Sequence, residues 1–371
     1  MRLTIDKPGL AKALAHVANV VERRNTIPIL SNVLLIADSN TLKLTATDLD
    51  MEVVETVACT TKSDGQVTVP AHMLYDIVRK LPDGGIELER DAEQERLVIT
   101  SGPARFSLQT LPADDFPTLS VEDLGHAFTI PAADLKRLIE KTRFAISTEE
   151  TRYYLNGIYL HEAQSDGETT LRAVATDGHR LAQVELPIPS GAKGMPGVIL
   201  PRKTVLDLFK LVEDEDGEVR IELSPSKVRI SAGHVVLTSK LIDGTFPDYE
   251  RVIPQGNDKR LEVDNGTFAQ AVDRVSTLSS DKGRAVKLAI SGDTLTLSVN
   301  NPESGSATEE LAVTYDFDPL EIGFNARYLL DISQQLQSET AEFLLADPGS
   351  PTIVRDLKDS SALYVLMPMR V

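Results

Sequence analysis

Residues 67–81, VTVPAHMLYDIVRKL, contain the pattern that best indicates the fold. Residues 67–69 alternate as strand residues do, and Pro70 follows them. Leu74 and Val78 then recur at the three-to-four spacing of a helix with one buried face. Proline suits the junction because its missing N–H has no partner in the first turn of a helix. The segment therefore predicts a strand that leads directly into an amphipathic helix.

The same strand-to-helix pattern starts six times along the chain. The starts are 61 to 70 residues apart, and they are Leu3, Val67, Phe128, Val198, Leu261 and Ile322. Each predicted helix is followed by alternating segments such as residues 42–46 and 219–223, which are typical of half-buried strands. The sequence thus predicts an α+β protein of six units, each with one helix against a few antiparallel strands.

The six units group in pairs. The odd units share a strand pattern at residues 42–48, 171–177 and 295–300, and Thr-Asp occurs at both 47–48 and 176–177. Proline and aspartate interrupt the periodicity at residues 111–119 and at residues 246–249. We therefore predict three homologous domains, each a duplicated helix-plus-sheet unit, with the bounds 1–121, 122–250 and 251–371.

Length and composition limit the class of protein. The 371 residues are 42% apolar and 25% charged, which is enough for several cores and excludes intrinsic disorder. Because the sequence shows neither a run of about 20 apolar residues nor an apolar signal segment, we expect a cytoplasmic protein. The single cysteine, Cys59, has no partner for an intramolecular disulfide or a zinc site. We expect no metal and an inert thiol.

The charge is unevenly divided. A total of −18, from 38 Lys+Arg against 56 Asp+Glu, argues against a nucleic-acid partner. However, the predicted helices carry 14 Lys and Arg against 8 Asp and Glu, or +6, which leaves −24 elsewhere. Lys and Arg are also ordinary helix formers on solvated faces, and the last two helices contribute none of the excess. The helix windows are 8–24, 70–81, 131–143, 201–212, 264–279 and 325–337.

Several segments resemble a known family. Residues 175–182 (ATDGHRLA), 246–249 (FPDY) and 364–371 (YVLMPMRV) resemble the signature segments of bacterial DNA polymerase sliding clamps, the beta subunits of DNA polymerase III. Residues 105–108 (RFSL) and 152–157 (RYYLNG) are also similar. The resemblance runs from residue 1 to residue 371 and includes the threefold architecture.

The resemblance implies a DNA clamp fold in a head-to-tail homodimeric ring. Twelve helices would line a hole around duplex DNA, and antiparallel sheets would form the outer wall. It implies a non-catalytic processivity factor without a cofactor, which tethers the polymerase III alpha subunit, the clamp loader and other polymerases and repair proteins through short linear motifs. Contacts to phosphate carry no base information, so such a ring can slide.

The resemblance also assigns site residues. The implied peptide-binding residues are Leu155, Thr176, Gly178, His179, Arg180, Leu181, Pro247, Arg251, Val252, Tyr328, Val365, Leu366, Met367, Pro368, Met369 and Arg370, with Val371 ending the tail. Flexible methionine side chains suit a pocket with several partners, although Met367 also fits ordinary core packing.

The implied DNA-binding residues lie on or beside the predicted helices. They are Arg24, Arg79, Lys136, Arg137, Arg152, Tyr153, Tyr154, Arg202 and Lys203, with Lys141 nearby. For each cation, a solvated surface charge is the competing interpretation. Glu22, Glu149 and the His72-Met73 pair depart from the family pattern, which puts DNA contact at those places in doubt.

The dimer interface is assigned to a strand edge. Phe106 and Leu108 alternate on a strand that would lie at the outer edge of the first domain, and Leu278 matches the apolar side of the joint. An unpaired edge is a template for another strand, so it can close a ring. Burial within one domain is the competing interpretation for each of these residues.

Two other functions stay open at this point. His179 could act as a base oriented by Asp177 in a hydrolase, or the chain could be a monomeric scaffold with no DNA role. Against an enzyme, the sequence has no phosphate-binding glycine loop, no H-E-x-x-H, no nucleophile elbow and no dinucleotide fingerprint.

Overall fold

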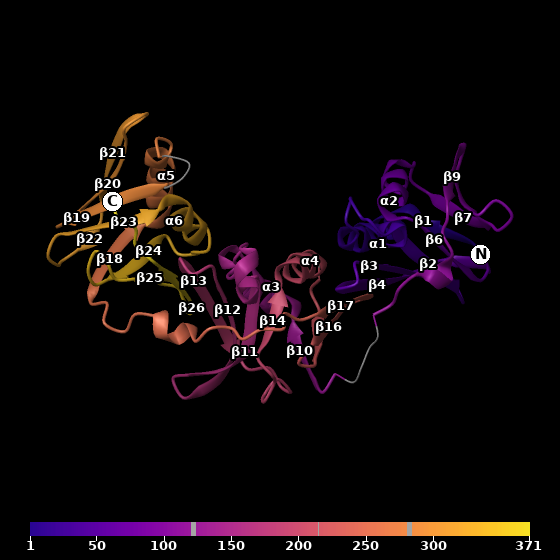
Figure 1. Ribbon diagram of the computed structural model, residues 1–371, viewed down its shortest axis with the longest axis horizontal. Coiled ribbons are helices and arrows are strands. Elements are labelled where there is room, and N and C mark those ends of the chain that lie inside the picture. Colours follow the sequence, from indigo (N-terminus) through magenta and orange to yellow (C-terminus); the bar gives the residue numbers. More distant parts are fainter. Residues whose placement is uncertain (120–123, 214, 280–283) are drawn as a thin grey trace. The chain divides into compact units, whose positions relative to one another are not determined.

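The computed structural model describes residues 1–119, 124–213, 215–279 and 284–371. They form two compact units. Figure 1 labels their helices and strands. Unit 1 comprises residues 1–136, 189–196 and 203–241, and unit 2 comprises residues 137–188, 197–202 and 242–371. The predicted domain boundary at 121/122 lies outside the described residues. The division between the units instead passes through the middle third of the chain.

All six predicted strand-to-helix starts are present. The helices are α1 (Lys7–Val20), α2 (Ala71–Lys80), α3 (Ala132–Glu140), α4 (Arg202–Val212), α5 (Asn265–Ser276) and α6 (Ala326–Ser333). The strands that lead into them are β1 (Arg2–Asp6), β6 (Gly65–Pro70), β10 (His126–Pro131), β14 (Val198–Pro201), β18 (Lys259–Asp264) and β23 (Leu320–Asn325). The side chains of Asp6, Asp264 and Asn325 cap α1, α5 and α6 by accepting backbone N–H bonds.

Unit 1 contains two antiparallel sheets. Their strand orders are β5-β1-β7-β8-β9 and β10-β15-β16-β17-β4-β3-β2-β6. The strands not yet given are β2 (Asn32–Asp38), β3 (Thr41–Thr47), β4 (Met51–Ala58), β5 (Thr60–Ser63), β7 (Gly85–Asp91), β8 (Arg96–Ser101), β9 (Ala104–Gln109), β15 (Glu218–Leu223), β16 (Lys227–Ala232) and β17 (Val235–Lys240).

Unit 2 also contains two antiparallel sheets. Their strand orders are β21-β20-β19-β23 and β14-β11-β12-β13-β26-β25-β24-β18-β22. The remaining strands are β11 (Gly157–Ser165), β12 (Glu168–Thr176), β13 (Arg180–Pro187), β19 (Ala285–Ser291), β20 (Thr294–Asn301), β21 (Gly305–Ala312), β22 (Thr314–Tyr315), β24 (Thr340–Leu345), β25 (Thr352–Asp356) and β26 (Asp359–Leu366).

Short 3₁₀ helices occupy five connections. They are η1 (Pro28–Ser31), η2 (Ala113–Asp115), η3 (Arg143–Ala145), η4 (Glu150–Leu155) and η5 (Tyr249–Val252). No helix in the described part of the chain is long and apolar enough to span a bilayer.

Each helix buries one face, as the apolar spacing predicted. Leu10, Leu14 and Val17 of α1 are fully buried, and α1 packs on β3 and β4. In α5, the ring of Phe268 meets that of Phe343 edge-on, with 5.3 Å between ring centroids. The helices also pack in pairs, α1 with α2 and α5 with α6. The cores therefore lie between paired helices and the sheets beneath them.

Two strand pairings join successive thirds of the chain into continuous sheets. At the first joint, β4 pairs with β17, and Met51 lies opposite Ser239. At the second joint, β13 pairs with β26, and Arg180 lies opposite Leu366. These joints are as regular as the pairings within a domain, which is why the compact units do not follow the predicted domain bounds.

Candidate functional site

A mostly apolar cavity of about 190 Å³ opens in unit 2. Its walls come from the turn between β12 and β13, the linker formed by residues 246–252, and the end of β26. The lining residues are Leu155, Thr176, Gly178, Arg180, Leu181, Pro247, Asp248, Tyr249, Val252, Val365 and Met367. Segments almost 200 residues apart in the sequence thus meet at this cavity, which we call the linker pocket.

Nine of the sixteen predicted peptide-binding residues line the linker pocket. Asp248 and Tyr249 line it as well, although they were not among the predicted site residues. Arg251 is exposed and pairs with Asp248 at 2.6 Å. Leu366 is buried on the opposite face of β26 from Val365, because successive strand residues alternate.

The turn at one end of the pocket requires a glycine. Gly178 has φ +87°, and a Cβ atom at this position would lie 2.5 Å from Nη1 of Arg152. The Asp177 carboxylate accepts the backbone N–H groups of His179 and Arg180 at 2.9 and 3.0 Å. The hydroxyl of Thr176 donates to the carbonyl of Arg180 at 2.7 Å. These contacts fix the turn that forms the rim of the pocket.

Arg180 is buried, with 7% of its side chain exposed. Its guanidinium donates to Asp177 at 3.2 Å, to Asp331 at 2.5 Å and to the carbonyl of Phe144 at 2.6 Å. It also lies between two rings, 4.3 Å from the centroid of Tyr328 and 5.1 Å from that of Phe144. Three acceptors and two aromatic rings within unit 2 thus fix the guanidinium of Arg180 beside the pocket.

A polar cavity of about 440 Å³ adjoins this turn. His179 and Tyr328 line it, and their rings stack at 26° with 6.5 Å between centroids. The Asp177 carboxylate binds the backbone of His179, and its second oxygen binds Arg180, so it does not orient the imidazole as a catalytic dyad requires. No group of three or more metal-binding side chains occurs in the described residues. The geometry does not support the hydrolase alternative.

The C-terminal tail runs from the pocket to β23. The backbone N–H of Met367 donates to the carbonyl of His179 at 2.9 Å, and that of Met369 donates to the carbonyl of Gly323 at 2.8 Å. A Cβ atom on Gly323 would lie 2.7 Å from the backbone carbonyl oxygen of Met369, so glycine allows the close approach of the tail. Pro368 and Met369 are half-buried, and Arg370 is exposed.

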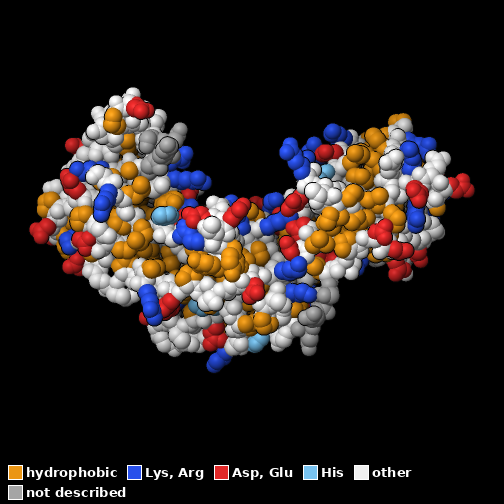
Figure 2. All heavy atoms as spheres, viewed as in Figure 1, with side chains coloured by type: hydrophobic (Ala, Val, Ile, Leu, Met, Phe, Trp, Pro, Cys, Tyr) orange, Lys and Arg blue, Asp and Glu red, His pale blue; other side chains and the backbone are white. Residues whose placement is uncertain are grey.

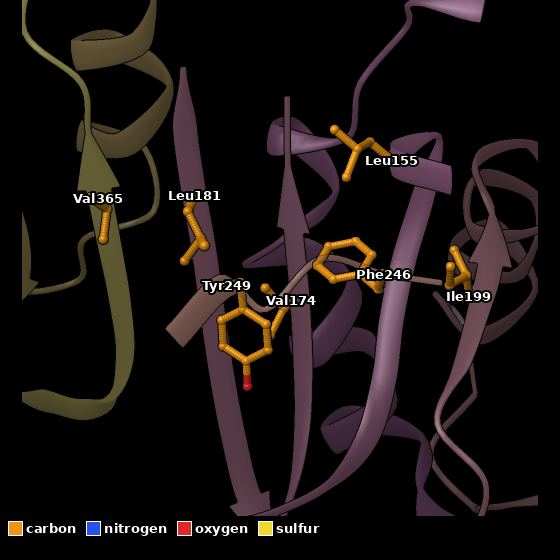
Figure 3. Close-up of a cluster of buried hydrophobic side chains, with 7 residues drawn as sticks. All are labelled: Leu155, Val174, Leu181, Ile199, Phe246, Tyr249 and Val365. Carbon is orange, nitrogen blue, oxygen red and sulfur yellow. The ribbon is translucent and has the colours of Figure 1, made fainter. Parts of the chain in front are cut away.

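A cluster of buried side chains lies behind the pocket (Figure 3). It consists of Leu155, Val174, Leu181, Ile199, Phe246, Tyr249 and Val365. Phe246 stacks on the ring of Tyr159 with centroids 4.9 Å apart. The segment that the sequence predicted as a linker is therefore part of the core, because two of its aromatic residues pack into the sheet beneath it.

Sequence reasoning missed a polar network beneath this linker. Arg172 donates to the Tyr249 hydroxyl at 2.9 Å and to Glu250 at 2.9 Å, and it pairs with Glu185 at 2.9 Å. His161 lies 3.0 Å from the same hydroxyl. Burial is the main cause that lowers the pKa of His161 and raises that of Tyr249. A charged residue inside the otherwise apolar strand 171–175 was the available signal.

The predicted DNA-binding cations differ in whether a carboxylate binds them. Arg137 pairs with Asp359 at 2.6 Å, Arg152 with Glu149 at 2.6 Å and Arg79 with Asp76 at 3.1 Å. Lys203 binds Asp48 and donates to the carbonyl of Val20 at 3.1 Å. Arg24 and Arg202 are exposed, and no described carboxylate forms an ion pair with either. Lys136 lies 5.8 Å from the centroid of the Phe209 ring.

The neighbouring residues of the implied DNA interface also have clear positions. Tyr153 is exposed, and its ring meets that of Tyr154 edge-on at 5.8 Å. Lys141 is buried, and its ammonium donates to the carbonyl of Gln335. Glu22 lies 3.5 Å from Lys203, and His72 contacts the carbonyl of Val21 at the end of α1 at 2.8 Å. Acidic residues thus neutralise Lys203 and Arg152.

One end of unit 1 exposes apolar side chains around α2 and β9 (Figure 2). Met73 is 54% exposed and Phe106 39% exposed. They line a mostly apolar hollow of about 510 Å³ together with Ile77, Leu81 and Pro82. Leu108 is buried within its own unit, and Leu278, just after α5, is half-buried.

Comparison with known proteins identifies one family along the length of the chain. The family of the DNA polymerase III beta subunit matches in three parts, its N-terminal domain at residues 1–120, its central domain at 129–248 and its C-terminal domain at 250–370. The beta sliding clamp of Caulobacter vibrioides is 56% identical over 372 residues, and that of Escherichia coli is 42% identical over 374 residues. Both matches span 100% of each chain.

Solved structures give the same result. The sliding clamp (DNA polymerase III subunit beta) of Bartonella birtlesii bound to griselimycin superposes with a TM-score of 0.97, at 56% identity and over 100% of both chains. The three-domain clamp fold follows from this likeness. The chain belongs to the DNA polymerase III beta subunit family of sliding clamps, which are non-catalytic processivity factors.

Proposed function

We propose that two copies of this chain close head-to-tail into a ring around duplex DNA, and that the linker pocket tethers polymerases and repair proteins to it. The ring would confer processivity without catalysing a reaction. It would act in the cytoplasm. The single observation that carries the proposal is a pair of unfilled strand edges, one at each end of the domain series.

The internal repeat supports the interpretation of these edges as the two halves of a third joint. β4 and β13 each follow the Thr-Asp turn of an odd repeat, and the corresponding strand of the third domain is β21. β17 and β26 are each the third strand after an even-numbered helix, and the corresponding strand of the first domain is β9. In the described residues, β21 pairs only with β20 and β9 pairs only with β8. A second copy can supply both missing partners.

The two existing joints also give a register for the third. Glu52 lies opposite Thr238 at the first joint. Ser107 and Thr238 each lie five residues after a hairpin glycine with φ +54°. Ser306 pairs with Asn300 as Glu52 pairs with Thr47. The third joint would therefore place Ser306 of one copy opposite Ser107 of the other.

The side chains near the two edges are complementary in charge. Arg105 is on β9, and Lys80 lines the apolar hollow beside that strand. Glu310 is on β21, next to Glu309, which already pairs with Arg274 at 2.6 Å. The second copy would cover Phe106 and the apolar hollow that it lines. Burying such a patch with opposite charges around it favours association and one orientation.

Cysteine cross-linking tests this joint. In a Cys59→Ser background, Ser107→Cys together with Ser306→Cys should give a covalent dimer on oxidation, measured by denaturing electrophoresis. The matched control pairs Ser107→Cys with Thr308→Cys, which moves the partner two residues along β21 and should cross-link far less. Equal yields from both pairs would reject the register. A mass near one chain in light scattering at all concentrations would reject the ring.

Arg24, Arg202 and Tyr153 are the exposed residues that best support DNA contact, because carboxylates already bind several other predicted cations. Changing Arg24 and Arg202 to Glu should reduce processive synthesis on primed DNA. The slope of log affinity against log salt should fall by about 2, since each phosphate contact contributes about one counterion. Lys358→Glu, an exposed cation in the β25–β26 turn, is the matched control. An unchanged slope in the double variant would exclude these two contacts.

The linker pocket supports peptide tethering because it is apolar, pre-formed and bordered by a backbone turn. Griselimycin, which two relatives hold in solved structures, is a suitable probe. Met367→Ala should weaken griselimycin binding by about tenfold, since a buried apolar contact is lost, and deletion of residues 367–371 should abolish it. Leu357→Ala, an exposed position in the same domain, is the control. Wild-type affinity in the truncated chain would reject the pocket.

A further inference from the structure

We propose that Arg172 and the hydroxyl of Tyr249 are positioning residues of the linker pocket: they hold the linker, one wall of the pocket, against the sheet from the side that a bound peptide does not touch. This inference rests on the proposed peptide-tethering function.

The linker is a pocket wall with little regular structure of its own. Pro247, Asp248, Tyr249 and Val252 line the cavity, and only η5 gives this segment backbone hydrogen bonds of a helical kind. Its position therefore depends on side chains that attach it to the sheet below. Phe246 supplies one attachment by stacking on Tyr159.

Tyr249 supplies the second attachment and has two distinct sides. Its ring lies in the buried cluster and lines the pocket, whereas its hydroxyl points away from Leu155 and Phe246 (Figure 3). The hydroxyl accepts a hydrogen bond from Arg172 at 2.9 Å and lies 3.0 Å from Nε2 of His161. Nδ1 of His161 lies 2.8 Å from the carbonyl of Glu162 and must donate to it, so Nε2 accepts the Tyr249 proton.

Three polar residues lie side by side on neighbouring strands of the sheet beneath this hydroxyl. His161 on β11 lies directly opposite Arg172 on β12, and Arg172 lies directly opposite Glu185 on β13. Arg172 has only 7% of its side chain exposed, and it binds Glu185 and Glu250 as well as Tyr249. A planar guanidinium holds its donors in a fixed arrangement and can bind a strand residue and two linker residues in one geometry, which the rotating ammonium of a lysine does not fix.

Neither Arg172 nor His161 lines the pocket, and the Tyr249 hydroxyl lies within hydrogen-bond distance of both. Arg172, His161 and the Tyr249 hydroxyl thus act on a ligand only through the position of the linker. A cavity of this kind loses affinity when a wall becomes mobile, because the ligand must then order that wall on binding.

The test compares Tyr249→Phe with Tyr315→Phe, using griselimycin binding to the full-length chain measured by calorimetry. Both variants remove one hydroxyl and keep the ring. Tyr315 donates to the carbonyl of Asp318 at 2.8 Å, outside the pocket. We expect Tyr249→Phe to weaken binding by about tenfold, the factor that one lost hydrogen bond gives, and Tyr315→Phe to leave binding unchanged.

Arg172→Lys and the double variant with Tyr249→Phe separate positioning from general stability. If both groups act through their shared hydrogen bond, the double variant loses less affinity than the sum of the two single losses. The free energy of unfolding of each variant is measured in parallel, and binding is measured where every variant is folded. Arg172→Lys retains the cation, so it should keep more affinity than Arg172→Met, a partial rescue that a purely structural role would not produce.

Wild-type affinity in Tyr249→Phe and Arg172→Lys would overturn the inference while leaving the pocket assignment intact. Absence of griselimycin binding to the wild-type chain would instead reject the pocket assignment, and the inference with it. If Arg172 variants fail to fold, Tyr249→Phe alone decides, since it removes a single oxygen from an otherwise unchanged core.

Discussion

The two internal joints have the same backbone pattern and different side chains at its centre. At the second joint, Arg180 is buried between the carboxylates of Asp177 and Asp331. At the first joint, the corresponding residue is Met51, which is fully buried and uncharged. The corresponding carboxylates, Asp48 and Asp207, are still present. Lys203 reaches Asp48 from α4, and one oxygen of Asp207 is buried without a partner.

The difference indicates that strand pairing, and not a particular ion pair, defines a joint in this fold. Five residues of β4 face five of β17, and five of β13 face five of β26. The side chains then satisfy the same carboxylates in two ways, with a buried guanidinium in one case and a half-exposed ammonium in the other. At the second joint Arg180 binds both carboxylates, whereas at the first joint one oxygen of Asp207 has no partner, so the two joints should respond oppositely to the same substitutions.

The largest effect is expected from Arg180→Met, which copies Met51 into the second joint. It leaves Asp331 and Asp177 near each other without their cation and removes both ring contacts. Unfolding in urea should show a loss of about 3–5 kcal/mol, the usual cost of removing one partner from a buried ion pair. Met51→Leu, which conserves volume, should cost less than about 1.5 kcal/mol. Equal losses for the two variants would show that Arg180 is not the main side-chain contribution to its joint.

The same change at corresponding carboxylates should have opposite signs. Asp331→Asn removes a charged partner of Arg180 and should lower the free energy of unfolding by about 2 kcal/mol. Asp207→Asn removes a buried, partly unpaired charge and should raise it by about 1 kcal/mol at neutral pH.

Urea unfolding at two pH values completes this comparison. Burial raises the pKa of Asp207 above its ordinary value, so the folded state binds the proton more tightly and the penalty is full only at neutral pH. The advantage of Asp207→Asn should shrink as pH falls through that raised pKa towards 3.8. A destabilised Asp207→Asn at pH 7 would contradict this account of the first joint.

Lys203→Met tests how much the first joint depends on its cation. It removes the ammonium that binds Asp48 and the carbonyl of Val20. Because Lys203 is partly exposed, water screens and replaces these contacts, and the expected loss is about 1 kcal/mol. Thermal unfolding is the measurement, with Lys358→Met as the exposed control. A loss as large as that of Arg180→Met would mean that the two joints depend equally on their cations.

The smallest effect is expected from acid on the linker network beside the second joint. Burial lowers the pKa of His161 below its ordinary value of 6.5, with Arg172 adding to this shift. The unfolded chain therefore binds a proton more readily, and stability should fall as pH drops below 6.5 until the lowered pKa is passed. The loss should be less than about 1 kcal/mol and absent in His161→Gln, as measured by urea unfolding at pH 7.5 and pH 5. A wild-type chain that gains stability in this range would contradict the sign.

Much of the fold could be predicted because its signals are local. The six strand-to-helix starts depend on spacing within about fifteen residues, and each is present. The joints could not be predicted, since the pairing of β13 with β26 links residues almost 200 apart and no local pattern selects the partner. Arg180 illustrates the limit for the site. The resemblance placed it at a pocket, but its burial between Phe144 and Tyr328 depends on three segments that meet only in the folded chain.

The unfilled edges of β9 and β21 have a consequence for how the assembly would open. Each internal joint is crossed by the polypeptide itself, which keeps its two strands at a high effective concentration even when their hydrogen bonds break. The joint between copies has no such tether, and its occupancy depends on protein concentration. Dilution or a loading protein would therefore release the proposed contact between copies first, because the chain does not cross that joint.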